Sequence, residues 1–212
     1  MKYIFYSIVI IFFTAALAFS NDNFFAAVHK GDINLVSQYL KNGININIQD
    51  NKKRTALMIA AYNNDVKMVK LLVENGADVN IQDENLNSPF LYAGARGLLD
   101  ILKLLYKKAD TINVLNIYGG NALIPACEKG HLETVRFLLE NTDINVNHVN
   151  RLSWTALLEV VILGNDSYNY VEIVKLLLKH GADKNIKDNR GNDALYYAKT
   201  KGFKNIEKLL AN

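Results

Sequence analysis

The chain has 212 residues, of which 50% are hydrophobic and 21% are charged, and its 24 basic and 21 acidic side chains give a formal net charge of +3. So small a basic excess argues against nucleic acid as the main ligand, which needs a concentrated basic footprint. The single cysteine, Cys127, excludes any disulfide within the chain.

Residues 1–20 have the pattern of a secretory signal peptide. Lys2 gives a short basic start, residues 4–18 are almost uninterrupted hydrophobic residues, and Ala18 and Ser20 offer small side chains near a cleavage position. The alternative is an uncleaved membrane anchor, although the apolar run of about 16 residues lies just under the roughly 17 to 25 needed to span a bilayer. We therefore expect export to the periplasm or secretion, with membrane attachment only if the leader is retained.

The segment of residues 54–83 predicts two short antiparallel helices. Small and apolar residues crowd positions 56–61, and a second apolar stripe at the spacing of one helical face covers positions 66–73. Residues 63–65, Asn-Asn-Asp, form the turn between them, because these side chains bond their own main chain. Gly76 stops the second helix. A unit of this size cannot bury its apolar faces alone, so it must stack on similar units.

The same unit recurs along the chain. Its small turn residue returns at steps of 33, 33, 33, 34 and 38 residues, at Gly31, Asn64, Gly97, Gly130, Gly164 and Gly202. This spacing indicates six repeats in a single domain of residues 21–212, at approximately 21–50, 51–83, 84–116, 117–150, 151–188 and 189–212. Alternating apolar residues at 79–81 predict an extended arm between units.

The fifth repeat carries five added residues, Asn165–Asn169, between its two helices. We expect them to form a polar bulge in the turn that leaves the stack intact. An insertion at one place in a repeat can serve binding, and neutral drift in an exposed turn is the alternative.

The period of 33 residues, with Thr55–Met58, Ser88–Leu91 and Thr155–Leu158 opening three units, resembles the ankyrin repeat. The stretches Val66–Asp78 and Val171–Asp183 are similar to the family's most recognisable segment. The resemblance covers roughly residues 23–212. It implies an all-α ankyrin-repeat solenoid of stacked helix-turn-helix units with hairpin arms, and a family of binding scaffolds whose partners are unrelated.

Two departures from the ankyrin pattern concern stability. Gly119 and Gly191 match the glycine of the hairpin tip, whereas Lys53, Leu86 and Ser153 do not, so those three tips either carry strain of about 1 kcal/mol each or adopt another turn. The family's histidine after its opening signature is also missing, which implies lost hydrogen bonds between repeats and a solenoid of moderate stability. We attribute the abundant Asn, Lys and Ile to genome base composition.

The sequence contains no motif of an enzyme. Phosphate loops and the patterns HExxH, GxSxG and CxxC are missing. Cys127 falls among small core residues of a helix, and the four histidines lie in four segments without a metal-binding spacing. We expect no catalysis, no cofactor and no metal; an enzyme accessory subunit is the alternative.

The resemblance places the binding surface on the concave side, at the hairpin tips and the nearby ends of the first helices. An apolar and aromatic group there, flanked by two arginines and with one tyrosine in the second repeat, is the candidate site: Ile117, Tyr118, Leu152, Trp154, Ile162 and Leu163, with Arg96, Arg151 and Tyr62. Trp, Tyr and Arg are enriched where a few contacts supply most of a binding energy. The alternative is that Trp154 covers a neighbouring arm and that Ile162 and Leu163 pack under the insertion.

The sequence therefore predicts a monomeric, non-catalytic scaffold that binds a protein through its concave face in an extracytoplasmic compartment. The alternative role is a secreted factor that engages a protein of another organism.

Overall fold

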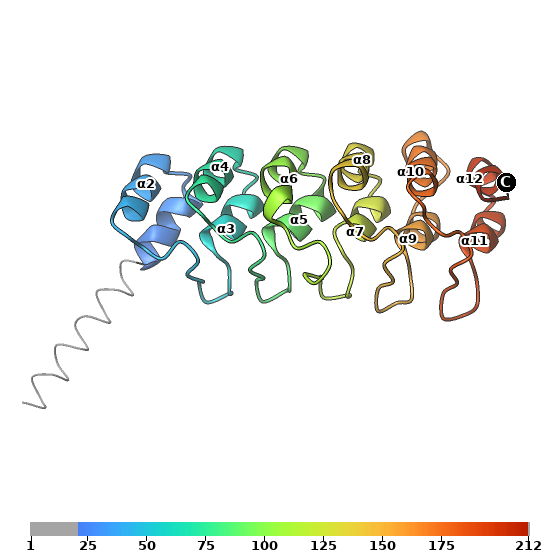
Figure 1. The fold of residues 1–212 in the computed structure, drawn as a ribbon, viewed down its shortest axis with the longest axis horizontal. Helices are drawn as coiled ribbons and strands as arrows, with labels where there is room; N and C mark the ends of the chain where they lie inside the picture. Colours follow the sequence, from blue (N-terminus) through green and yellow to red (C-terminus); the bar gives the residue numbers. More distant parts are fainter. Residues whose placement is uncertain (1–20, 212) are drawn as a thin grey trace, which may run out of the picture. The chain divides into compact units, whose positions relative to one another are not determined.

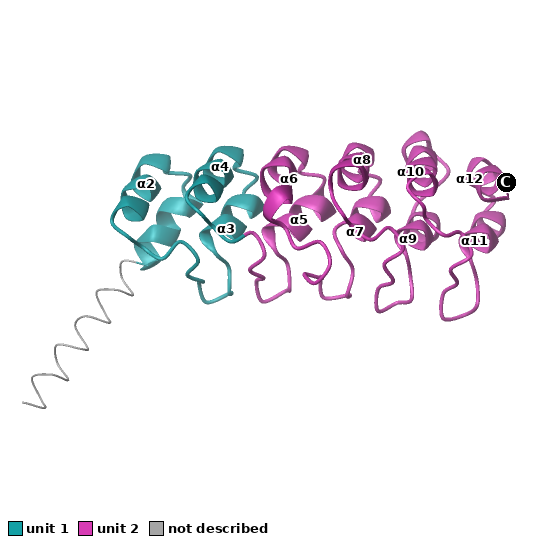
Figure 2. Ribbon diagram, viewed as in Figure 1, with its two compact units in different colours: residues 1–78 teal, residues 79–212 magenta. Residues whose placement is uncertain are grey.

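The computed structural model describes residues 21–211, and the expected signal peptide, residues 1–20, lies outside the described residues. Every regular element between residues 21 and 211 is helical, as the sequence predicts. The chain divides into two compact units, residues 1–78 and 79–212 (Figure 2). Within residues 21–211, no helix has both the length and the hydrophobicity that crossing a membrane requires.

The first unit contains two helix pairs. Residues 21–29 form its first helix, and α2 (Ile33–Lys41), α3 (Ala56–Tyr62) and α4 (Val66–Glu74) follow. In Figure 1, α2 and α4 lie in one layer, and the helix of residues 21–29 lies with α3 in the other. Phe24 and Phe25 of the first helix are 0% and 8% exposed, so both pack inward.

Within the second unit, the helices also lie in two layers. Its elements are α5 (Pro89–Arg96), α6 (Leu99–Leu105), the 3₁₀ turn η1 (Tyr106–Lys108), α7 (Leu123–Glu128), α8 (Leu132–Asn141), α9 (Ala156–Leu163), α10 (Tyr168–Lys179), α11 (Ala194–Lys201) and α12 (Lys204–Ala211). Helices α5, α7, α9 and α11 pack in sequence, as do α6, α8, α10 and α12. Hairpin loops project from the layer of α5, α7, α9 and α11 (Figure 1).

The opening signature of α3, α5 and α9 supplies an N-cap. The side chains of Thr55, Ser88 and Thr155 accept hydrogen bonds from the backbone amides three residues later, at 3.1, 3.2 and 3.2 Å. Asp193 caps α11 in the same way at 2.8 Å. Such caps satisfy amides that the first turn of a helix leaves without partners, which is why the helices begin where the signature predicts.

The hairpin tips without glycine adopt the same turn as those with it. Lys53, Leu86 and Ser153 have φ of 56°, 56° and 63°, in the region that L side chains rarely enter. Gly119 and Gly191 have φ of 69° and 80°. Of the two predicted outcomes, the strained one is therefore confirmed.

An acidic or amide side chain holds each strained tip in place. At the tip that contains Leu86, Asp83 Oδ1 accepts hydrogen bonds from the backbone amides of Asn85 and Asn87 at 2.9 and 3.0 Å. Asn150 does the same for Leu152 and Trp154 at 2.9 and 3.0 Å. These bonds hold the loop around the left-handed residue, so the surrounding structure compensates for the strain.

The arms do not pair as strands, contrary to the alternating pattern at residues 79–81. Residues 79–83 are irregular, and Val79 is buried at 1% exposure. Hydrogen bonds from side-chain amides connect neighbouring arms in place of a β-ladder. Asn80 donates to Lys108 O at 3.0 Å and accepts from Asp110 N at 2.7 Å.

The asparagines of the arms therefore have a structural role. In the fourth repeat, Asn147 bridges to the arm of the next repeat, because it donates to Gly181 O at 2.9 Å and accepts from Asp183 N at 2.8 Å. Asn47 accepts from Asp78 N at 2.9 Å within the first unit. Bonds between repeats are thus supplied by asparagine where the family's histidine is missing. The attribution of the abundant asparagine to genome base composition stays a prediction.

The insertion in the fifth repeat is not simply a bulge. Tyr168 already belongs to α10, so the insertion lengthens this helix, and only Gly164–Ser167 form the turn. Gly164 has φ −83° and ψ −157°, unlike the left-handed residue at the other turns. Tyr168 is 73% exposed.

A candidate groove for protein binding

A groove of about 720 Å³ lies in the second unit. Its walls come from the hairpin tips at residues 85–87, 116–120 and 150–154 and from one face each of α5, α7 and α9. The tips and helices of three successive repeats thus form one continuous depression.

The groove brings together five of the nine side chains that the sequence singles out, namely Ile117, Tyr118, Leu152, Trp154 and Leu163. Four of them are exposed large apolar residues: Tyr118 is 61% exposed, Ile117 51%, Leu163 49% and Leu152 45%. Trp154 is half-buried. Exposed apolar side chains gathered in one concavity are the usual mark of a contact surface.

The remaining four predicted residues do not line this groove. Arg151 ties two hairpin tips together, because its Nη1 donates to Ile117 O at 2.8 Å and its backbone amide to Tyr118 O at 2.8 Å. Ile162 is half-buried, and its carbonyl accepts a hydrogen bond from the Lys201 ammonium. Arg96 is exposed in the last turn of α5, and Tyr62 belongs to the first unit.

The groove also contains Glu159, an acidic residue that the sequence reading missed. Glu159 is the one charged residue among seven apolar residues of α9, and it is 7% exposed. Its Oε2 has no hydrogen-bond partner. A lone charge in an otherwise apolar helix was the available signal, because a buried acid must find a partner or change its pKa.

The surroundings of Glu159 favour its neutral form. Burial raises the pKa of this carboxyl from 4.5 to about 7, and the nearby Glu128 charge adds to the increase. A hydrogen bond from the Asn150 side chain and the charge of Lys129 act in the opposite direction. A substantial share of this carboxyl is therefore protonated at neutral pH.

The next hairpin contains a carboxyl in a comparable place that does have a hydrogen-bond partner. Asp188 lies at the hairpin position that corresponds to Asn150, and it accepts a hydrogen bond from the Tyr197 hydroxyl, nine residues later. Glu159 lies nine residues after Asn150. In the fifth repeat the carboxyl thus lies on the helix instead of the hairpin, and one of its oxygens is buried without a hydrogen-bond partner.

The groove does not supply a nucleophile. Cys127 is buried behind it at 0% exposure, and burial, followed by the charge of Glu159, raises the pKa of its thiol well above the ordinary value. A thiol held neutral and away from solvent is inert. Within residues 21–211, His, Cys, Asp and Glu side chains form no cluster able to hold a metal ion.

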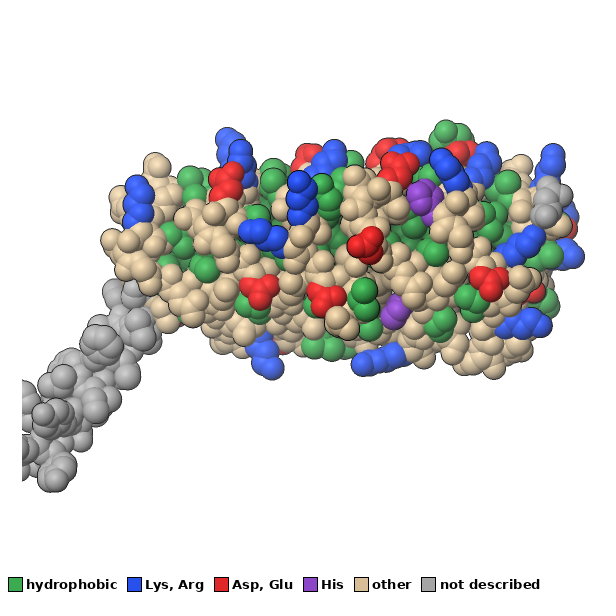
Figure 3. All heavy atoms as spheres, viewed as in Figure 1, with side chains coloured by type: hydrophobic (Ala, Val, Ile, Leu, Met, Phe, Trp, Pro, Cys, Tyr) green, Lys and Arg blue, Asp and Glu red, His purple; other side chains and the backbone are tan. Residues whose placement is uncertain are grey.

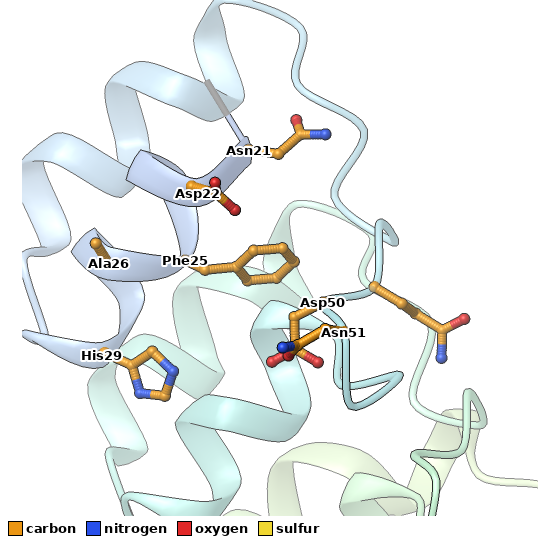
Figure 4. Close-up of a pocket in the computed structure, with 8 residues that line it drawn as sticks. Asn21, Asp22, Phe25, Ala26, His29, Asp50 and Asn51 are labelled. Carbon is orange, nitrogen blue, oxygen red and sulfur yellow. The ribbon is translucent and has the colours of Figure 1, made fainter. Parts of the chain in front are cut away.

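A smaller hollow of about 490 Å³ lies in the first unit, between the helix of residues 21–29 and the first hairpin. Figure 4 shows Phe25 pointing from the helix toward Asp50 and Asn51. Asp50 is paired with the Arg54 guanidinium at 2.6 Å. Burial raises the pKa of Asp50, but hydrogen bonds from Arg54 and Lys52 outweigh this effect and hold it below the usual value. This hollow therefore lacks the unsatisfied polar group that marks the larger groove.

Charged side chains do not gather into a basic stripe on the face seen in Figure 3, where Lys and Arg are interspersed with Asp and Glu. This distribution agrees with the small net charge.

Comparison with known proteins identifies the family. A family model described as ankyrin repeats in three copies matches residues 24–115, 96–188 and 126–212. The chain belongs to the ankyrin repeat family. Ankyrin repeats generally mediate binding between proteins, and the family is typically non-catalytic.

Solved structures agree in fold. This ankyrin repeat protein is similar to an ankyrin repeat domain from Acinetobacter baumannii AYE, with a TM-score of 0.86 and 46% identity over 89% of this chain and 96% of that one. It is also similar to the ankyrin repeat protein EF0377, with a TM-score of 0.85 and 42% identity over the same shares of the two chains. The predicted all-α ankyrin fold is confirmed.

Curated relatives match over shorter segments. A putative ankyrin repeat protein of Escherichia coli (strain K12), YahD, is 42% identical over 76 residues, which are 36% of this chain and 38% of the relative. The mitochondrial disaggregase of Bos taurus is 38% identical over 78 residues, which are 37% of this chain and 10% of the relative. The matched segments thus span well under half of either relative.

Proposed function

We propose that this ankyrin repeat protein is a non-catalytic scaffold that holds a partner protein in the groove of its second unit. The observation that carries the proposal is the convergence of Ile117, Tyr118, Leu152, Trp154 and Leu163 on one concavity. Burying exposed apolar and aromatic side chains against a partner releases water from them, which favours association.

Affinity capture with matched variants tests this proposal. The protein is tagged at its carboxyl end and expressed in its native cells as wild type, as a Tyr118→Ala, Leu163→Ala double variant, and as Tyr168→Ala. Tyr168 is an equally suitable exposed tyrosine, at 73% exposure, and it does not line the groove. We expect wild type and Tyr168→Ala to retain the same partner.

The double variant should lose about tenfold or more in affinity for that partner, since each side chain at the centre of an interface can contribute more than 1.4 kcal/mol. Equal retention of the partner by all three proteins would place the binding surface elsewhere.

The proposal further locates the protein outside the cytoplasm, in the periplasm or in the medium. The support is the signal-peptide pattern of residues 1–20. Cell fractionation with a marker for intact membranes distinguishes a resident periplasmic scaffold from a secreted factor that acts on another organism's protein.

Mass spectrometry of the mature amino terminus separates the cleaved form from a membrane-anchored one. A mature chain that starts near residue 21 supports export and cleavage, whereas a cytoplasmic chain with an intact amino terminus contradicts the proposed location.

A further inference from the structure

The groove holds one polar group that the protein itself leaves unsatisfied. Glu159 lines the groove with 7% of its surface exposed, and its Oε2 has no hydrogen-bond partner. Its other contact is the hydrogen bond from the Asn150 side chain. Oε2 itself is buried, and buried carboxyl oxygens normally have partners, so a donor that enters the groove and draws this carboxylate outward would supply the missing bond.

The charged groups around Glu159 leave room for a cation. On the neighbouring helix α7, Glu128 adds negative charge, and Lys129 is already paired with Glu128 at 2.7 Å. From α11, the Lys201 ammonium is bound to the carbonyl of Ile162. Arg151, on the hairpin before α9, is bound to the carbonyl of Ile117. The nearby cations therefore have other partners. Of the charged groups on α7, its C-cap and α9, the carboxyls of Glu128 and Glu159 outnumber the ammonium of Lys129.

The walls of the groove suit a long aliphatic chain. Leu163 lies four residues after Glu159 on α9, so both side chains share one face of the helix. Trp154 and Leu152 add apolar surface from the hairpin. A lysine or arginine side chain can bury its methylene stem against such a surface while its charged end meets an acid.

We propose that the groove receives a lysine or arginine side chain of the partner protein, with its cationic end bound to the Glu159 carboxylate. This inference rests on the proposed function and names the chemistry of the contact. A salt bridge to Glu159 favours its ionised form, so the partner binds as the carboxyl loses its proton. A short, charge-assisted bond in a desolvated site discriminates strongly between a cation and a neutral donor.

Peptide selection supplies a defined probe. A library of random 12-residue peptides without tryptophan is displayed on phage and selected against the full-length protein at pH 8. Synthetic copies of the selected peptides are then titrated while the fluorescence of Trp154 is recorded. Since Trp154 is the single tryptophan of the chain and lines the groove, only peptides that change its emission are counted as groove ligands.

Each lysine or arginine in these groove ligands is replaced by norleucine, which keeps the aliphatic stem and removes the charge. We expect one replacement to weaken binding to the wild type about tenfold or more. The same replacement should change binding to Glu159→Gln less than twofold. Glu140→Gln, an exposed glutamate on α8 outside the groove, is the matched control and should behave like the wild type.

A second variant guards against a folding defect in Glu159→Gln. In Leu163→Lys, the new cation lies one helical turn after Glu159, the favourable order for such a pair. Leu163→Lys should raise the melting temperature and weaken the binding of the groove peptides about tenfold or more. Leu163→Gln, which removes the same apolar surface without adding charge, should weaken peptide binding less.

The outcomes separate the two proposals. One contrary result is that peptides change Trp154 emission without losing affinity when their lysine or arginine is replaced. Another is that the replacement costs the same affinity for the wild type and for Glu159→Gln. Either result overturns the cation site and leaves groove binding intact. If no selected peptide changes Trp154 emission, both the cation site and the proposed binding groove are wrong.

Discussion

Asp166, in the segment between α9 and α10, caps a helix that begins nearly forty residues later. Its carboxylate accepts hydrogen bonds from the backbone amides of Asn205 and Ile206, both at 3.0 Å, at the start of α12. Phe203, which precedes α12, has no side-chain oxygen to make these bonds, whereas Asp32 and Asp65 cap α2 and α4 from within their own repeats. The insertion of the fifth repeat thus completes the terminal helix.

Replacing Asp166 by Ala should therefore destabilise the carboxyl-terminal repeat. We expect a loss of about 1 kcal/mol, the usual cost of removing a helix cap. Hydrogen exchange should accelerate at the amides of α12 first. Asp166→Asn, which keeps an acceptor oxygen, should retain most of the protection, and unchanged exchange in Asp166→Ala would contradict a capping role.

Replacing the strained residues of the hairpin tips by glycine should stabilise the protein. Leu86 and Ser153 have φ of 56° and 63°. Relief of the left-handed strain, about 1–2 kcal/mol per residue, exceeds the roughly 0.5–1 kcal/mol entropic cost of a glycine. Leu86→Gly and Ser153→Gly should each raise the free energy of unfolding by about 0.5–1 kcal/mol in urea titrations. Their alanine counterparts keep the strain and should not stabilise.

Removing an asparagine bridge should weaken the contact between two arms. Asn147→Ala loses the bonds to Gly181 and Asp183, and we expect a cost of about 1–2 kcal/mol in the free energy of unfolding. Asn141→Ala is the control, because its side chain bonds only within its own helix, to Phe137 O at 3.0 Å. Equal costs for both variants would show that the bridge adds nothing.

The protonation of Glu159 should make stability depend on pH. Its pKa is about 7 in the folded protein and 4.5 as the model value, so the folded state holds this proton more tightly than the unfolded state. Its contribution to stability is therefore fully present below about pH 4.5 and decreases as the pH rises to about 7.

Glu159→Gln should remove this dependence. Relative to the wild type, we expect the variant to gain roughly 2 kcal/mol in the free energy of unfolding at pH 8 and little at pH 5. Urea titrations at the two pH values measure the difference. A gain of the same size at both would mean that ionisation of Glu159 is not its source.

The two aromatic side chains of the groove should differ in their effect on stability. Tyr118 is 61% exposed, so Tyr118→Ala should change the free energy of unfolding by less than about 0.5 kcal/mol. Trp154 is half-buried, so Trp154→Ala should cost more, about 1–2 kcal/mol. Thermal unfolding measures both, and a large loss in Tyr118→Ala would assign it to the core.

Most of the fold could be predicted from the sequence because its signals are local. Thr55, Ser88 and Thr155 begin helices through bonds to amides three residues away, and each such signal is contained within one repeat. The candidate site was predicted in part. Five of the nine predicted side chains line the groove, since their positions follow from the hairpin and helix pattern.

The rest depends on which residues of different repeats meet. Oε2 of Glu159 lacks a hydrogen-bond partner, and the nearby Lys129 is paired with Glu128. Arg151 does not line the groove, and its guanidinium is bonded to the carbonyl of Ile117 in the preceding hairpin. The sequence pattern of one repeat does not say which side chains of neighbouring repeats will pair.

The sequence by itself determined the family, the all-helical class and the positions of the strained hairpin tips, because repeat period, capping residues and turn residues act over a few positions of the chain. Only the tertiary structure decided that the insertion caps α12, that asparagines bridge the arms and that one oxygen of Glu159 lacks a partner. Each of these depends on a hydrogen bond, made or missing, between groups in different segments, and such bonds exist only once the repeats are stacked.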